Sequence, residues 1–137
     1  MWLMLRGLFI MIKLNNKGQS LVLFVLLLPI LLLVMVLVID VGNVIVKKQE
    51  IDNINYLTID YGLEHFDDID LESKLENMLV LNNVDFSNVE ININDNKIEI
   101  FINKKVNGVF VKQFNIFSLK SRYVGYIKED KKIIERV

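Results

Sequence analysis

Few side chains in this chain could do chemistry: it has 137 residues, one histidine and no cysteine. The lack of cysteine excludes thiolate zinc sites, disulfide bonds and a thiol nucleophile. The single histidine, His65, argues against a zinc site, and no serine is spaced with it in a recognisable nucleophile motif. No glycine-rich loop for a phosphate is present either. The sequence therefore predicts no catalytic residue, no cofactor and no small-molecule substrate, and we expect a protein that is not an enzyme.

A run of carboxylates between positions 64 and 76 is the remaining candidate for a ligand site. An EF-hand calcium loop needs a glycine at its sixth position and a glutamate at its twelfth, and this run supplies neither. Acidic side chains are favourable at a helix start, because they complement the positive end of the helix dipole. We therefore interpret the run as a solvated helix start that holds no metal; its members are Glu64, Asp67, Asp68, Asp70, Glu72 and Glu76.

Acidic and basic residues are sorted along the chain, although the formal net charge is only −1. Residues 50–99 hold 13 acids and two lysines, whereas residues 100–137 hold nine basic residues and three acids. One hypothesis is docking guided by complementary patches. The alternative is that the two sets meet inside one fold or are simply solvated. Because the basic part is matched by acids, the sequence predicts no nucleic-acid partner.

An uncharged apolar run over residues 21–39 indicates whether this part of the chain lies in water or in lipid. Its sequence is LVLFVLLLPILLLVMVLVI. At about 1.5 Å per residue this run would make a helix about 28 Å long, close to the roughly 30 Å hydrocarbon core of a bilayer. A helix on the surface of a soluble domain keeps a polar face, and this run has none. We interpret it as a single transmembrane helix, with the lipid bilayer as the first partner.

Flanking charges predict the orientation of that helix. Three basic residues and no acid precede it: Arg6, Lys13 and Lys17. Asp40 follows it directly. The positive-inside rule makes residues 1–20 a short basic cytoplasmic leader and puts the C-terminal part outside the cytoplasm. The run is longer than the apolar part of a signal peptide, and residues 39–42 offer no small-x-small cleavage motif, so we expect a retained anchor in the cell membrane. The start codon stays open between Met1, Met4 and Met11, with a late start favoured.

Beyond the membrane, periodicity predicts two helices. Apolar residues at spacings near three and four predict that the first helix extends over residues 40–64 as an amphipathic helix, with Gly62 as its stop. A second helix is predicted over residues 71–81, where Asp68 or Asp70 can cap its start.

The clearest element of the outer part is a hairpin over residues 89–102, with Asp95-Asn96 as its turn. This turn places six apolar residues on one face and the charged ones on the other, so a register slip of one residue would bury the charges. The predicted pairs are Val89 with Ile102, Ile91 with Ile100 and Ile93 with Ile98.

The residues after the hairpin predict further β-strands. Asn107-Gly108 suits a further hairpin turn, or else residues 109–117 form a short helical or irregular segment. Residues 119–127 predict a third strand that can return through 129–131 into 132–137. The economical arrangement is α+β: residues 65–137 form a small extracytoplasmic domain in which helix packs on one face of an antiparallel sheet.

Short motifs surround the apolar run. They are Lys17-Gly18-Gln19-Ser20 before it, Leu21-Val22-Leu23-Phe24 at its start, Pro29 within it, Ile39-Asp40-Val41-Gly42 at its end, and Ile51-Asp52-Asn53 beyond it. This set resembles the TadE/TadG-like family, small envelope proteins of the Tad (Flp-type) pilus assembly system. The resemblance implies a structural, pilin-like component of a pilus or secretion apparatus. Its partners would be other membrane proteins of that apparatus, or further copies of itself.

The resemblance also implies a processing site after Gly18, which would make Gln19 the first mature residue. Members processed like pilins carry a glutamate at the fifth mature position, where this chain has Leu23. A carboxylate at that position costs a few kcal/mol of membrane-insertion free energy, so it is retained only where it has a function. Its absence favours the TadG-like branch, anchored and uncleaved.

We expect lateral association of the membrane helix with other helices, through an interface at Gly18, Phe24, Pro29, Asp40 and Gly42. For Asp40 the alternative is an interfacial carboxylate that ends the span, and for Pro29 it is plain tolerance rather than a functional kink. A different class of function also stays open, a membrane-anchored sensor or accessory binding subunit of another envelope complex.

Overall fold

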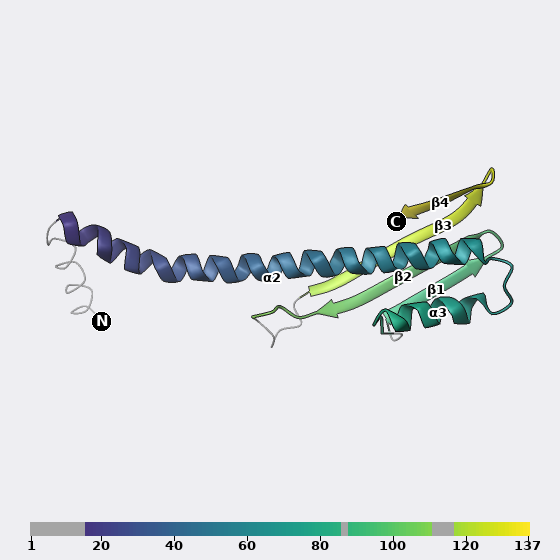
Figure 1. The fold of residues 1–137 in the computed structure, drawn as a ribbon, viewed down its shortest axis with the longest axis horizontal. Helices are drawn as coiled ribbons and strands as arrows, with labels where there is room; N and C mark the ends of the chain where they lie inside the picture. Colours follow the sequence, from purple (N-terminus) through teal and green to yellow (C-terminus); the bar gives the residue numbers. More distant parts are fainter. Residues whose placement is uncertain (1–15, 86–87, 111–116) are drawn as a thin grey trace. The chain divides into compact units, whose positions relative to one another are not determined.

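The structure, a computed structural model, describes residues 16–85, 88–110 and 117–137. Two compact units make up the chain, residues 1–39 and residues 40–137. Figure 1 shows the elements in chain order: α2 (Asn16–Glu64), α3 (Leu71–Leu81), β1 (Val89–Asn94), β2 (Lys97–Val106), β3 (Phe117–Lys128) and β4 (Lys131–Arg136). The predicted α+β class is confirmed. Most of the predicted leader and its three candidate start codons lie outside the described residues.

In the first unit, helix α2 carries the apolar run. Among the described residues it is the one helix long and apolar enough to cross a membrane, and none of its most apolar window is buried. The core helix of a soluble protein would be mostly covered by other elements, so this exposure agrees with lipid as the surroundings. Pro29 lies inside α2 and does not end it. Membrane helices tolerate proline where neighbouring groups satisfy the freed carbonyl.

The second unit is built on a four-stranded antiparallel sheet with the order β1-β2-β3-β4. The predicted register of the first hairpin is confirmed, because Val89 pairs with Ile102, Ile91 with Ile100 and Ile93 with Ile98. The return from β3 into β4 is also confirmed. Its turn residues, Glu129 and Asp130, have φ values of 51° and 60°. Positive φ at both central residues is what a tight type I′ turn requires.

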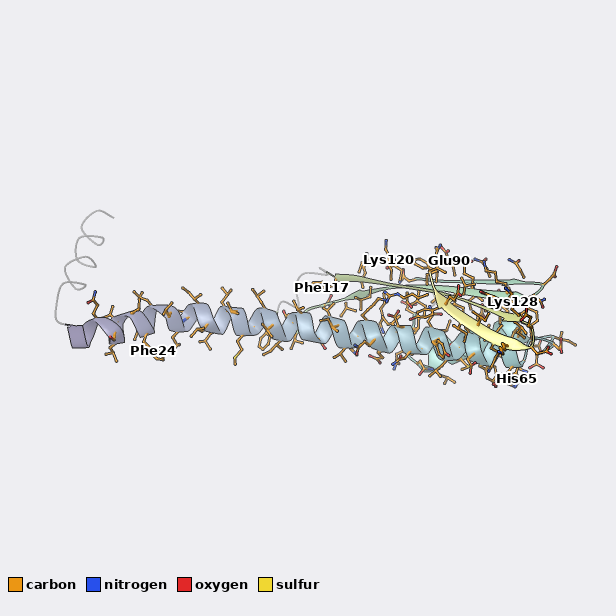
Figure 2. The ribbon with its side chains drawn as sticks, turned by 90° about the horizontal axis from the view of Figure 1, so that it is seen from above. Phe24, His65, Glu90, Phe117, Lys120 and Lys128 are labelled. Carbon is orange, nitrogen blue, oxygen red and sulfur yellow. The ribbon has the colours of Figure 1, made fainter. Side chains whose placement is uncertain are left out.

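One face of the sheet carries the core. The inward residues of β2 are buried against apolar residues of α2 and α3, which lie on the same side of the sheet; the fully or nearly fully buried members are Ile51, Ile59, Leu63, Leu71, Leu75, Leu79, Ile98, Ile100 and Ile102. Figure 2 shows Glu90 and Lys120 on the face of the sheet that points away from these helices. The alternation of apolar and polar residues therefore decides which face is covered.

Gly62 does not stop the helix, contrary to the prediction. Helix α2 runs on to Glu64, and a Cβ added at Gly62 would lie 2.7 Å from Cδ1 of Ile98. Gly125 of β3 is in a similar position, since its Cβ would lie 2.2 Å from Cγ2 of Ile59. These two glycines let α2 approach the sheet closely, which explains glycine inside a helix and inside a strand.

Helix α3 spans residues 71–81 as predicted, but no side chain caps its start in the predicted way. Asp70 occupies the N-cap position, yet its side chain makes no capping hydrogen bond, and the Asp68 carboxylate instead accepts one from Lys74 at 2.7 Å. The end of α3 has the geometry of a Schellman motif. Asn83 has φ of 58°, and the amide of the buried Val84 donates to the Leu79 carbonyl at 3.0 Å.

The connection after β2 is not a two-residue hairpin at Asn107-Gly108. Strand β2 ends at Val106 and β3 begins at Phe117, with no regular structure over residues 107–110. The irregular alternative is therefore right for Val109 and Phe110, whereas Phe117 is the first residue of β3. Residues 111–116, including Phe114, lie outside the described part of the chain.

Candidate functional site

The residues expected to form a membrane-helix interface do not share one face of α2. Within the first unit, Gly18 and Pro29 are 11 positions apart, which is about three helical turns, so they lie on one side. Phe24 lies on α2 about 120° away from Gly18 and is 58% exposed. The structure therefore brings Gly18 and Pro29 to one face and leaves Phe24 on another.

Gly18 and Gln19, the possible processing site, are consecutive exposed residues near the start of α2. A Cβ added at Gly18 would have no described atom within 4 Å. No contact within the described chain accounts for the glycine, and Gly18 and Gln19 stay a possible processing site that the structure does not test.

In the second unit, Asp40 and Gly42 face opposite ways. Gly42 is exposed and has open space around the position of an added Cβ, whereas Asp40 is 5% exposed. Two residues along a helix turn the side chain by about 200°, so one partner cannot use both from one side. Gly42 is available to a neighbouring helix, and Asp40 is occupied within the chain.

The Asp40 carboxylate binds the loop that follows β2. Its Oδ1 accepts hydrogen bonds from the backbone amides of Val109 at 2.8 Å and Phe110 at 3.2 Å. A Cβ added at Gly108 would lie 2.6 Å from Oδ2 of Asp40, so glycine leaves room for the carboxylate. Hydrogen bonds to an ionised acceptor are among the stronger ones in proteins. The sequence did not predict this role of Asp40, because its partners lie about 70 positions away. The one local signal was Gly108, which lies in the loop next to Val109.

A second polar contact joins helix to sheet. Nδ2 of Asn55, which is fully buried on α2, donates to the Ile100 carbonyl at 3.1 Å, to the Ser121 hydroxyl at 3.1 Å and to the Ser121 carbonyl at 3.3 Å. Within the described residues, Oδ1 of Asn55 is buried without a hydrogen-bond partner. Buried polar groups without partners are costly, so this contact fixes a position rather than adding much stability.

Part of the sorted charge is paired inside the fold. Nζ of Lys132 on β4 lies 2.6 Å from Asp60 and 2.7 Å from Glu64, both on α2. Hydrogen bonds to these two carboxylates raise the pKa of Lys132 above its ordinary value. Arg136 lies 3.7 Å from Asp52 in the same way. These pairs fit the alternative in which the acidic and basic sets meet within one fold.

The acidic run brings no metal-binding group together. Among the described residues, no three side chains of the metal-ligating types form a cluster that could hold an ion. The ring of His65 stacks on Tyr61 at 4.1 Å, and its Nδ1 lies 3.0 Å from the Tyr61 carbonyl oxygen. A hydrogen bond with Lys74 lowers the pKa of Asp68, although that pair is exposed and contributes little stability.

Comparison with known proteins gives a match to a family model. Residues 18–54 match the model of the family described as TadE-like protein. No match was found among curated proteins or among solved structures. The match starts at the glycine before the apolar run, covers the whole run and ends one residue before Asn55. The resemblance drawn from the motifs is therefore confirmed over this part of the chain: residues 18–54 are similar to the TadE-like family.

Proposed function

We propose that this protein is a structural, pilin-like component of a Tad-type pilus assembly or secretion apparatus. The observation that carries the proposal is the TadE-like match over residues 18–54, which includes the entire apolar run. In the proposed arrangement residues 21–39 span the cell membrane, the N-terminus lies in the cytoplasm and the second unit lies outside. The absence of a carboxylate at Leu23 supports an anchored, uncleaved protein of the TadG-like type.

The proposed mechanism is lateral association of α2 with helices of other subunits. Lipid is as apolar as leucine, so helices associate in a bilayer through close packing and small residues rather than through the hydrophobic effect. Gly18 and Gly42 support this mechanism, because each leaves open space on the surface of α2. Phe24 supplies a large exposed side chain that a partner helix could cover.

Cysteine cross-linking in membranes tests the mechanism directly, because the chain has no cysteine of its own. Single cysteines would be placed along two turns of α2 from Phe24 to Leu31, in cells that make the whole apparatus. We expect cross-linking to a partner to rise and fall with a period of about 3.6 residues. Equal cross-linking at every position, or none, would contradict association through a defined helix face.

Gly42→Leu tests the small-residue contact, with Val38→Leu as the matched control. Both positions are exposed, so neither leucine meets an atom of the described chain that would resist it strongly. We expect Gly42→Leu to reduce assembly of pili while the protein still accumulates in the membrane, and Val38→Leu to have little effect. If the Gly42→Leu variant assembled normal pili, Gly42 would not be part of the proposed interface.

Deletion of the gene tests the function itself. We expect loss of surface pili and of the secretion that depends on them, with recovery on return of the unaltered gene. Unchanged pili would favour the other class, a sensor or accessory subunit of a different envelope complex. The mass of the mature protein isolated from membranes would show whether the chain is cut after Gly18.

A further inference from the structure

Exposed apolar side chains continue beyond the end of the membrane run. Two short segments of the second unit carry them: the first turns of its part of α2, and the loop after β2. We name this set the apolar collar; it consists of Val41, Ile45, Val46, Val109 and Phe110, each between 44% and 60% exposed. Exposed apolar groups gathered at one place in a small domain usually mark an interaction surface.

Asp40 holds the two loop residues of the collar in place. It is the residue directly after the apolar run, and its carboxylate accepts the backbone amides of Val109 and Phe110 at 2.8 and 3.2 Å. The loop therefore lies beside the first residue of the second unit, which directly follows the apolar run in the sequence. Oδ1 of the buried carboxylate accepts both amides, so the two backbone N–H groups and this oxygen satisfy one another within the chain.

The helix half of the collar has the length of a headgroup layer. Val41 and Val46, the first and last helix residues of the collar, lie about 7.5 Å apart along the axis of α2 at the rise of an α-helix. The polar layer on each side of a bilayer is roughly 5–8 Å thick, from about 30 Å of hydrocarbon within about 40–45 Å in total. The first charged side chains on α2 after this stretch belong to Lys47 and Lys48, where the layer would give way to water.

We propose that the apolar collar sits in the headgroup layer of the outer leaflet, so that the Val109–Phe110 loop is a second membrane contact that does not span the bilayer. Amphipathic and aromatic side chains favour this boundary, where an apolar surface meets acyl chains and the backbone still meets polar groups. The contact would hold the second unit against the membrane surface instead of leaving it tethered by α2 alone. This inference rests on residues 21–39 spanning the membrane and does not depend on the pilus role.

Depth-dependent quenching tests the collar in the full-length protein. Single cysteines at Phe110, Ile45, Leu31 and Ile69 would each carry a nitrobenzoxadiazole label, in vesicles of phosphatidylethanolamine and phosphatidylglycerol. Nitroxide quenchers would be placed near the headgroup or deep in the acyl chain. Ile69 is the matched control, an apolar residue of the same unit that is fully exposed and follows the end of α2 at Glu64, which is about 36 Å along the helix from Asp40.

We expect the labels at Phe110 and Ile45 to lose at least half of their fluorescence to the shallow quencher, and the label at Ile69 to lose almost none. The label at Leu31 should respond best to the deep quencher. A water-like label at Phe110 together with a deeply quenched Leu31 would overturn the collar while leaving the anchor intact. An unquenched Leu31 would overturn the span and the collar with it.

A second variant tests Asp40 as the residue that positions the loop. Asp40→Ala removes the acceptor of the two loop amides without changing the apolar side chains of the collar. We expect quenching at Phe110 to fall at least twofold, while quenching at Ile45 stays the same, because Ile45 is held by α2. Equal quenching at Phe110 with and without the carboxylate would contradict the positioning role.

Discussion

The side-chain amide of Asn55 on α2 donates hydrogen bonds to both the hydroxyl and the carbonyl oxygen of Ser121 on β3, 66 positions further along the chain. Both side chains are fully buried between helix and sheet. A shift of the helix by one turn would leave the amide buried without acceptors, at a cost comparable to a lost hydrogen bond. This pair therefore sets where residues 40–64 of α2 lie along the sheet.

Ser121→Ala should lower the free energy of unfolding by about 1 kcal/mol, the usual value of one hydrogen bond. Asn55→Leu should cost at least as much, and the double variant should cost less than the sum of the two, because the pair acts as one unit. Denaturant unfolding of the full chain in detergent micelles, followed by tyrosine circular dichroism, would measure this. Ser118→Ala is the exposed control. Additive effects of the two core substitutions would contradict a direct coupling.

Gly125→Ala should destabilise the second unit by about 1–3 kcal/mol, the range for overpacking. The added Cβ would lie 2.2 Å from Cγ2 of Ile59, and backbone or side chain must move to admit it. Ile59→Ala should recover part of the loss when combined with Gly125→Ala, although alone it leaves a cavity. Gly42→Ala is the control: its Cβ meets open space, and alanine favours a helix by up to about 1 kcal/mol over glycine. A stable Gly125→Ala protein would mean that helix and sheet are less closely packed.

Asp40→Ala should expose the backbone amides of Val109 and Phe110 to solvent exchange. Two hydrogen bonds to a carboxylate are lost, each worth about 1.5–3 kcal/mol when the acceptor is charged, so exchange should quicken about tenfold or more. Amide hydrogen exchange by NMR in micelles measures the two rates. Asp67→Ala, at an exposed acid of the same unit, should leave them unchanged. Slow exchange in Asp40→Ala would show that another group holds the loop.

Lys132 should keep its proton to a higher pH in the folded protein than in the unfolded chain. Hydrogen bonds to Asp60 and Glu64 raise the pKa of Lys132, so the stabilisation is fully present below the unfolded pKa and is lost as the pH rises through the folded pKa. NMR titration of the Lys132 side chain measures that pKa. The double variant Asp60→Asn with Glu64→Gln should bring it down towards the ordinary lysine value. An unchanged titration would contradict the pairing.

Local pattern predicted the regular elements well. The register of the β1–β2 hairpin follows from strict alternation and a two-residue turn, because any slip would bury Glu90 or Glu99. The bounds of α3 followed from the spacing of Leu71, Leu75 and Leu79 in the same way. The TadE-like segment was found from motifs that lie close together in the sequence.

Contacts between distant residues could not be predicted in this way. Gly62 is a helix stop by local rules, yet packing against Ile98 overrides its propensity, and α2 continues to Glu64. The bond from Asn55 to Ser121 and the bonds from Asp40 to the loop each join residues more than 60 positions apart. Only the folded arrangement of helix and sheet shows that these polar residues need one another.

Labelling from outside the cell tests most directly whether lipid surrounds residues 21–39 and whether the second unit lies beyond it. A single cysteine at the fully exposed Ile69 would be treated with a membrane-impermeant maleimide in intact spheroplasts. A cysteine within the leader, in place of Ser20, is the paired control. We expect Ile69→Cys to react without lysis and Ser20→Cys to react only after it. Labelling of Ile69→Cys only after lysis, or recovery of the full-length protein from the soluble fraction, would contradict it.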